Sequence, residues 1–140
     1  MNPLIICFDI DGVLAVNTLG TTHTVADIVK WTNDDWHKYF DQCVPNKDLI
    51  DKIKVLHSLG HIIKLFTARA DTHSIITEDW LHRFEVPYHS IQFNKPTADV
   101  YFDDRAFQFT TAEEAMRLIS NEVRPIFPEI LHMYPPKGDG

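Results

Sequence analysis

Residues 5–14 read IICFDIDGVL, an apolar run that ends abruptly in two carboxylates, Asp9 and Asp11. The apolar run has no helical period, which is typical of a buried β-strand. Because Asp9 and Asp11 alternate with Ile10, both carboxylates can lie on the same side of an extended chain. Like charges at this spacing repel one another, so the pair indicates a place where a cation or a retained proton compensates the negative charge.

Three further apolar runs predict β-strands, at residues 61–67, 90–93 and 99–104. In two segments that separate these predicted strands, apolar residues recur at helical spacing. They predict helices at residues 46–60, where Gly60 marks the end, and at residues 72–84.

Two more helices are expected to begin at polar capping residues, a short one at Asn33 or Asp34 and a last one at Thr111. Alternating strands and helices favour a parallel sheet. The sequence therefore predicts an α/β fold, a single Rossmann-like domain with helices on both faces of the sheet. We assign residues 1–122 to this domain and residues 123–140 to a Pro-rich C-terminal tail.

The patterns also predict which side chains are buried. A first strand buried on both faces would make Cys7 a buried thiol rather than half of a disulfide. Four histidines are expected at the surface or in loops, namely His57, His61, His82 and His89. The helical residues expected to face the core are Leu49, Ile50, Ile53, Leu56 and Leu59 in one helix and Ile75, Ile76, Trp80, Leu81 and Phe84 in the next.

The composition is that of one globular domain. A chain of 140 residues with 44% hydrophobic content can bury a core of its own. Its net charge of −7 argues against a protein that coats nucleic acid, although it leaves room for a local basic patch. The N-terminal residues lack the basic lead-in of a signal peptide, and no stretch approaches the roughly 18 apolar residues of a membrane helix. We therefore expect a soluble, cytoplasmic protein.

Polar and charged side chains occur at the carboxyl end of each of the four predicted strands. Ligands of parallel sheets bind outside these ends, so the side chains are expected to form one site. The segments that carry them are Asp9 to Asp11 after the first strand, Thr67-Ala68-Arg69 after the second, Asn94-Lys95-Pro96 after the third, and Asp103-Asp104-Arg105 at the end of the fourth.

These residue types suit a phosphoryl group beside a magnesium ion. Crowded carboxylates without Cys or clustered His select Mg²⁺ over zinc. Thr67 can donate its hydroxyl, and Lys95 and Arg69 add positive charge for an anion that faces the metal. One carboxylate can attack phosphorus to give an aspartyl-phosphate, while its neighbour protonates the leaving oxygen. Gly12 permits a tight exit from the strand, so that the backbone approaches the phosphate closely.

The motifs FDIDGVL, FTAR, NKP and YFDDR, in this order on these strands, resemble those of the haloacid dehalogenase superfamily of phosphohydrolases. The resemblance covers residues 4–107. It implies that Asp9 is the nucleophile and that Asp11 is the general acid/base, which also lends its backbone carbonyl to the metal. It further implies that Asp103 holds Mg²⁺ directly, and that Asp104 does so directly or through water.

The resemblance thus implies two sets of binding residues. The metal ligands would be Asp9, Asp11, Asp103 and Asp104. The residues that bind phosphate would be Gly12, Thr67, Ala68, Arg69 and Lys95, with Lys95 also stabilising the nucleophile.

Many members of that superfamily insert a cap domain between the first and second motifs or between the second and third. Here the segments between Asp11 and Thr67, and between Thr67 and Lys95, are too short for one. The chain is similar to small capless members, such as the phosphatase part of bacteriophage polynucleotide kinases and small phosphatases of nucleotide or surface-sugar metabolism. The implied substrates are a nucleotide, a nucleic-acid 3′-phosphate or a sugar phosphate. An open site is also compatible with a homo-oligomer in which a neighbouring subunit closes it.

Other interpretations compete with that of a phosphatase. A calcium loop is rejected for two reasons. Counted from Asp9, Gly12 is the fourth residue of the loop, whereas a calcium loop has its glycine at the sixth position. A calcium loop is also flanked by helices, whereas this loop follows a strand. A phosphoacceptor signalling domain would place its lone Asp in mid-chain, where this chain has Thr67. A catalytically inactive, metal-binding interaction module is the remaining alternative. Trp36, Tyr39 and Phe40 are expected in the core or, alternatively, at the substrate entrance.

Overall fold

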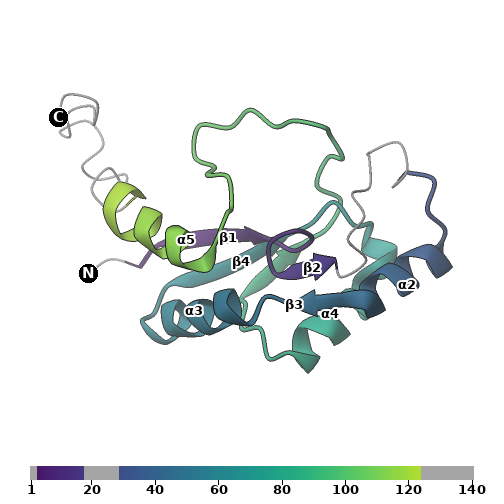
Figure 1. The fold of residues 1–140 in the computed structure, drawn as a ribbon, viewed down its shortest axis with the longest axis horizontal. Helices are drawn as coiled ribbons and strands as arrows, with labels where there is room; N and C mark the ends of the chain where they lie inside the picture. The colour runs from purple at the N-terminus through teal and green to yellow at the C-terminus, as the bar shows by residue number, and fades with distance from the viewer. Residues whose placement is uncertain (1–2, 18–28, 124–140) are drawn as a thin grey trace. The chain divides into compact units, whose positions relative to one another are not determined.

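The computed structural model describes residues 3–17 and 29–123 (Figure 1). The chain divides into two compact units, Met1–Ala106 and Phe107–Gly140, and each is described by itself. The sequence placed a boundary at residue 122. The Pro-rich tail, apart from its first residue, lies outside the described residues.

The first unit is organised by a three-stranded parallel sheet in the order β1-β4-β5. Its strands are β1 (Ile5–Asp9), β4 (Ile62–Phe66) and β5 (Ser90–Gln92). Asp9 at the end of β1 is in register with Phe66 at the end of β4, and Phe66 is in register with Gln92 at the end of β5. The three carboxyl ends therefore share one edge, and the predicted α/β, Rossmann-like fold is confirmed.

A small antiparallel pair that the sequence did not predict follows the first strand. Strand β2 (Ala15–Asn17) pairs with β3 (Cys43–Pro45). The Asn46 side chain donates a hydrogen bond to the backbone oxygen of Val13 at 3.2 Å. The loop after β1 is thereby fixed to Asn46, the residue that caps the helix at Lys47–Ser58.

The described residues include four α-helices: α2 (Asn33–Gln42), α3 (Lys47–Ser58), α4 (Ser74–Arg83), which a short 3₁₀ turn at Asp71–His73 precedes, and α5 (Ala112–Leu118), which a π-helical turn at Ile119–Val123 follows. Thr32, rather than Asn33 or Asp34, caps α2 in a reciprocal capping box with Asp35. The predicted cap at Thr111 is confirmed, because its hydroxyl accepts a hydrogen bond from the Glu114 backbone.

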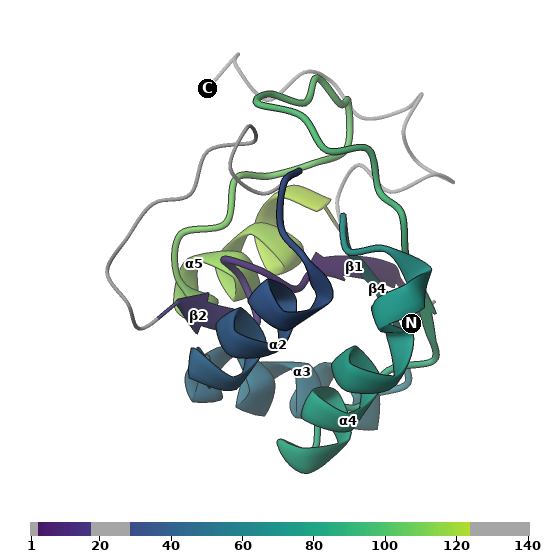
Figure 2. The same cartoon turned by 90° about the vertical axis from the view of Figure 1, so that its right-hand side faces the viewer.

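Helices α3 and α4 lie on the same side of the sheet (Figures 1 and 2). The side chains of Phe8, Ile63 and Leu65 are buried on that side. On the other side of the strands, Ile5 and Cys7 are exposed. The prediction of a buried Cys7 is therefore wrong, because β1 alternates between a covered and an accessible face instead of being covered on both.

Two residues assigned to the core by spacing are exposed. Leu59 is 69% exposed and Ile75 is 82% exposed. Leu59 lies one residue beyond the end of α3, and Ile75 lies in the first turn of α4 on the side away from Thr77, which is buried in its place. Helical periodicity marks a face only where the helix actually continues against a partner.

His61 is buried, contrary to its expected place at the surface. Its Nδ1 accepts a hydrogen bond from the backbone N–H of Leu4 at 2.9 Å, and Nδ1 of His89 accepts one from Ile63 at 3.0 Å. These two imidazoles satisfy backbone donors at strand starts, where the sheet ladder offers no carbonyl.

The predicted fourth strand at residues 99–104 does not form. The segment is irregular, and Phe102 is 95% exposed. Two local hydrogen bonds compete with a strand: Tyr101 Oη donates to the Pro96 carbonyl, and the Asp103 carboxylate accepts from the Arg105 N–H at 2.7 Å. An apolar run of three residues between aspartates therefore bends back toward the preceding loop.

The described helices include none that is long and apolar enough to cross a membrane.

Substitution of two leucines, three residues apart, tests the burial at the end of α3. Leu56 is 3% exposed and Leu59 is 69% exposed. We expect Leu56→Ala to lower the free energy of unfolding by about 2–5 kcal/mol, because it leaves a cavity in the core. Leu59→Ala should change it by less than about 0.5 kcal/mol. Chemical denaturation measures both, and equal losses would contradict the assigned end of the helix.

The buried His73 predicts a pH dependence of stability. Burial, and secondarily the charge of Arg69, lower the pKa of His73 below its ordinary value of 6.5. As the pH falls through about 6.5, the unfolded chain takes up a proton that the folded chain does not. The unfolded state then binds more protons, so stability falls with decreasing pH. Denaturation between pH 7.5 and 5 should show a shallower decline for His73→Gln, whereas the exposed His82→Gln serves as the matched control.

Candidate functional site

The loops after β4 and β5 are joined by backbone hydrogen bonds at the carboxyl edge of the sheet. The N–H of Lys95 donates to the carbonyl of Thr67, and the N–H of Asn94 donates to the carbonyl of Arg69, both at 2.9 Å. Asn94 adopts a left-handed conformation with φ of 65°. The predicted FTAR and NKP motifs are therefore adjacent, as their positions after neighbouring strands indicated.

The loop after β1 turns tightly at Gly12. The Gly12 N–H donates to the Ala15 carbonyl, and the backbone N–H groups of Leu14 and Ala15 both donate to the Ile10 carbonyl, each at 2.9 Å. Gly12 has a φ of +84°, which side chains disfavour. The glycine makes the sharp turn that brings Asp11 back toward the strand ends.

Asp9 is paired with Lys95. The Lys95 ammonium lies 3.0 Å from Oδ2 of Asp9, and the Ile10 N–H donates to Oδ1 at 2.8 Å. Burial raises the pKa of Asp9 above its ordinary value, while the bond to Lys95 opposes that rise. Both side chains stay partly accessible, so this carboxylate is compensated by one cation and still open to a ligand.

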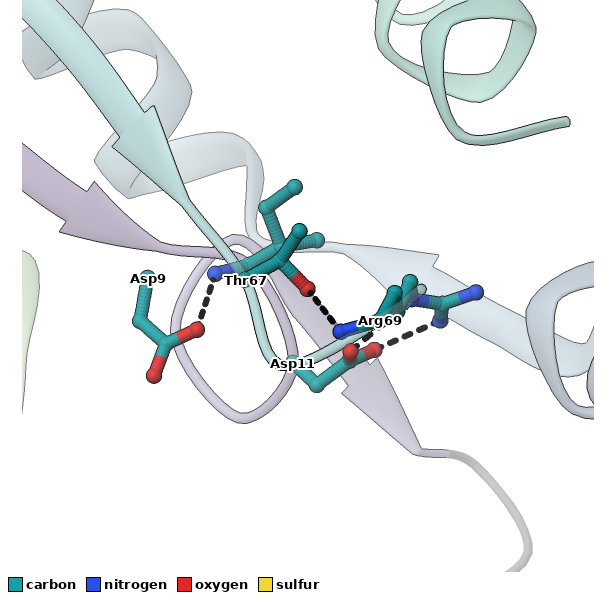
Figure 3. Close-up of polar contacts among 5 residues, drawn as sticks. Asp9, Asp11, Thr67 and Arg69 are labelled. Carbon is teal, nitrogen blue, oxygen red and sulfur yellow. Dashed lines mark hydrogen bonds and ion pairs between the residues drawn. The ribbon is translucent and has the colours of Figure 1, made fainter. Parts of the chain in front are cut away.

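Asp11 is held by Arg69 through two hydrogen bonds (Figure 3). Arg69 Nη2 lies 2.6 Å from Oδ1 of Asp11, and Arg69 Nε lies 2.9 Å from Oδ2. Arg69 is only 1% exposed, whereas Asp11 is partly accessible. Arg69 was expected to bind phosphate, but in this arrangement its side chain is engaged by Asp11.

Thr67 is fully buried at the start of the same loop. Its hydroxyl oxygen accepts a hydrogen bond from the Arg69 N–H at 3.1 Å (Figure 3). The hydroxyl thus shapes the loop that carries Arg69 and does not face solvent. Its predicted bond to phosphoryl oxygens, like that of Ala68, stays a prediction.

Helix α2 supplies the surface on which Arg69 lies. The guanidinium carbon is 3.7 Å from the ring centre of Phe40, 4.9 Å from that of Trp36 and 5.5 Å from that of Tyr39. Aromatic faces attract a cation and shield it from water. The spacing of these rings along α2 was visible in the sequence, but nothing in the spacing identified Arg69 as their partner.

Two neutral groups, Cys43 and Tyr39, lie near Asp11, and only Tyr39 was singled out from the sequence. Burial raises the pKa of Cys43 to about 11, and burial also raises the pKa of Tyr39. The two side chains are hydrogen-bonded to each other, and the charge of Asp11 contributes to both shifts. Neither carries charge near neutral pH, so Arg69 is the neighbour that compensates Asp11.

The four predicted metal ligands do not come together in this arrangement. Within the described part of the chain, no three His, Cys, Asp or Glu side chains lie close enough to hold a metal ion. Asp103 and Asp104 are exposed on the irregular segment, and Asp9 and Asp11 are each bonded to a cationic side chain. The predicted magnesium site is therefore not assembled in this arrangement, and the binding of Mg²⁺ stays a prediction.

A hollow of about 500 Å³ lies against the accessible face of the sheet. Cys7, Lys64, Ser90 and Gln92 are among the residues that line it, and neither Asp9 nor Asp11 is. The hollow thus does not contain the carboxylates that the sequence pointed to. We place the candidate site instead at the carboxyl edge of the sheet, where Asp9 and Asp11 lie with their cationic partners.

Comparison with known proteins bears on the fold alone. No family model matches the sequence, and neither does any curated protein. A crystal structure of a structural genomics target from Vibrio cholerae is similar, with a TM-score of 0.53 and 22% sequence identity over 86% of this chain and 99% of that chain. At this identity the likeness supports the α/β architecture and says nothing about activity.

Proposed function

We propose that this protein is a phosphatase of the haloacid dehalogenase type, which hydrolyses phosphomonoesters through an aspartyl-phosphate on Asp9. The observation that carries the proposal is the separate pairing of the two carboxylates: Asp9 with Lys95, and Asp11 with Arg69. Two acids one residue apart thus have different partners, which is the arrangement that a division between nucleophile and acid/base needs.

In the first step an oxygen of Asp9 attacks phosphorus. A bond forms between that oxygen and phosphorus, the bond between phosphorus and the leaving oxygen breaks, and Asp11 gives the leaving oxygen its proton. Lys95, 3.0 Å from Asp9, neutralises the charge on the transferring group.

In the second step water attacks phosphorus and Asp11 takes the proton of the water. The bond between the Asp9 oxygen and phosphorus breaks, which releases inorganic phosphate, restores the Asp9 carboxylate and leaves Asp11 protonated for the next cycle. This step needs Asp11 as a carboxylate, and in that form both of its oxygens can accept the bonds from Arg69. In the first step Asp11 carries a proton, and therefore must lose one of its two bonds to Arg69.

A magnesium requirement belongs to the proposal as well. If bound by carboxylates at this edge, the ion would supply positive charge for the transferring phosphoryl group.

Substitution of the two acids separates their proposed roles. With p-nitrophenyl phosphate and Mg²⁺, Asp9→Asn should abolish turnover, because the nucleophile is lost. Asp11→Asn should lower kcat by about 100- to 10,000-fold, which is the usual contribution of a general acid/base. The exposed Asp51→Asn in α3 is the matched control, and EDTA should remove the activity of the unsubstituted protein.

Undiminished turnover in Asp9→Asn would overturn the proposed mechanism. A folded, unsubstituted protein that hydrolyses no phosphomonoester would favour the alternative of an inactive binding or phosphoacceptor module.

Arg69 is proposed as a positioning residue that acts through Asp11. Arg69→Lys keeps the positive charge but cannot form the bidentate hydrogen bond to Asp11, so we expect kcat to fall by about 10- to 100-fold. In an Asp11→Asn background the same substitution should have little further effect on kcat, because the group that it positions is absent. Steady-state kinetics of the four proteins measure this coupling. Independent, multiplying losses would show that Arg69 acts on something other than Asp11.

A further inference from the structure

Three aromatic side chains form a cluster beside the Asp11–Arg69 pair. The ring centres of Trp31 and Trp36 are 4.7 Å apart in an edge-to-face arrangement, and Tyr39 lies 5.0 Å from Trp31 and 6.0 Å from Trp36. All three are only half-buried, in contrast to the neighbouring Phe40, which is buried and stacks on Trp80. We call Trp31, Trp36 and Tyr39 the aromatic cluster.

One side chain, that of Arg69, contacts both the aromatic cluster and the proposed acid/base, Asp11. Asp11 is bonded to Arg69, and the Arg69 guanidinium lies against the rings of Trp36 and Tyr39. In the proposed reaction Asp11 meets the oxygen of the leaving group. A leaving group that extends from Asp11 past Arg69 would reach the aromatic cluster.

The Arg69 guanidinium lies between Asp11 and the rings, and this separation favours a particular kind of leaving group. An aryl phosphate carries its ring on the ester oxygen itself, which would keep the ring next to Asp11. A sugar phosphate offers no flat aromatic ring for π-stacking. A nucleotide places a sugar between the ester oxygen and a flat base, which corresponds to the one guanidinium that separates Asp11 from the rings of the cluster. Half-buried aromatic side chains are the groups on which bases stack, with little regard to base identity.

We infer that the aromatic cluster binds the base of a nucleotide leaving group, so that the substrate is a nucleoside monophosphate or the phosphorylated end of a nucleic acid. This inference rests on the proposed phosphatase function for its orientation, but base binding by the cluster can be measured without any turnover.

Tryptophan fluorescence tests binding alone. Adenosine, which has no phosphate, should quench the fluorescence of the unsubstituted protein and of Asp9→Asn, because stacking on Trp31 or Trp36 alters their emission. Ribose should not. Trp31→Leu should weaken the affinity for adenosine by about 10-fold, in the range measured for one stacked base. Phe84→Leu, a half-buried aromatic that follows the far end of α4, is the matched control and should leave the affinity unchanged.

Kinetics then test substrate class. We expect kcat/KM for nucleoside 3′- or 5′-monophosphates to exceed that for ribose 5-phosphate by about 10- to 100-fold. Trp31→Leu should reduce this ratio toward one. A 3′-phosphorylated oligonucleotide in the same series distinguishes a free nucleotide from a nucleic-acid end as the source of the base.

The outcomes separate the two proposals. Quenching by adenosine without hydrolysis of any phosphomonoester would support base binding and contradict the phosphatase. Hydrolysis without quenching, or with equal kcat/KM for nucleotides and ribose 5-phosphate, would overturn base binding and leave the phosphatase standing. Should Trp31→Leu fail to fold, the ligand comparisons on the unsubstituted protein still decide.

Discussion

The buried ion pair between Arg69 and Asp11 is the interaction on which the site depends. A guanidinium that is 1% exposed has to be compensated, and the two bonds to Asp11 together with the face of Phe40 do this. Removal of one partner from such a pair typically costs about 3–5 kcal/mol, less here because Asp11 is partly open to solvent. The pair fixes the loop after β1 relative to the loop after β4, and therefore fixes the position of the proposed acid/base.

The same pair gives the two carboxylates different environments although they are neighbours in sequence. Lys95 is a single point charge that contacts one oxygen of Asp9 and leaves that carboxylate room to react. Arg69 engages both oxygens of Asp11 in a planar fork, which restricts rotation of the carboxylate. A reacting nucleophile needs access, whereas a proton carrier needs a fixed direction. Lysine and arginine are therefore not interchangeable at these two positions.

Much of the fold could be predicted from the sequence, because its determinants are local. The turn at Gly12, the end of α3 before Gly60 and the cap at Thr111 each depend on residues within a few positions of one another. The carboxyl ends of the parallel strands also had to share one edge of the sheet, which brought Lys95, after β5, to Asp9 at the end of β1.

What could not be predicted depends on contacts between distant segments. Cys7 is exposed because of which face of β1 the helices cover, and His61 is buried because Leu4 needs an acceptor. The run at 99–104 has the residues of a strand, yet its local hydrogen bonds are made instead. Two of the four predicted magnesium ligands, Asp103 and Asp104, stand on that segment, so the position of these two could not be predicted either.

Helix α2 shapes one side of the candidate site. It lies in the sequence between the first and second motifs, where many members of the superfamily that the motifs resemble carry a cap. Here its inner residue, Phe40, shields Arg69, while Trp36 and Tyr39, four residues and one residue earlier in the helix, stay half-exposed. In the proposed mechanism this one helix has two tasks: its buried ring packs against the guanidinium that orients Asp11, and its accessible rings bind the leaving group. Because both tasks use the same helix, a displacement of α2 would alter the direction of the acid and the leaving-group surface together. In the proposed mechanism, substrate specificity and catalysis would therefore both depend on the position of this helix.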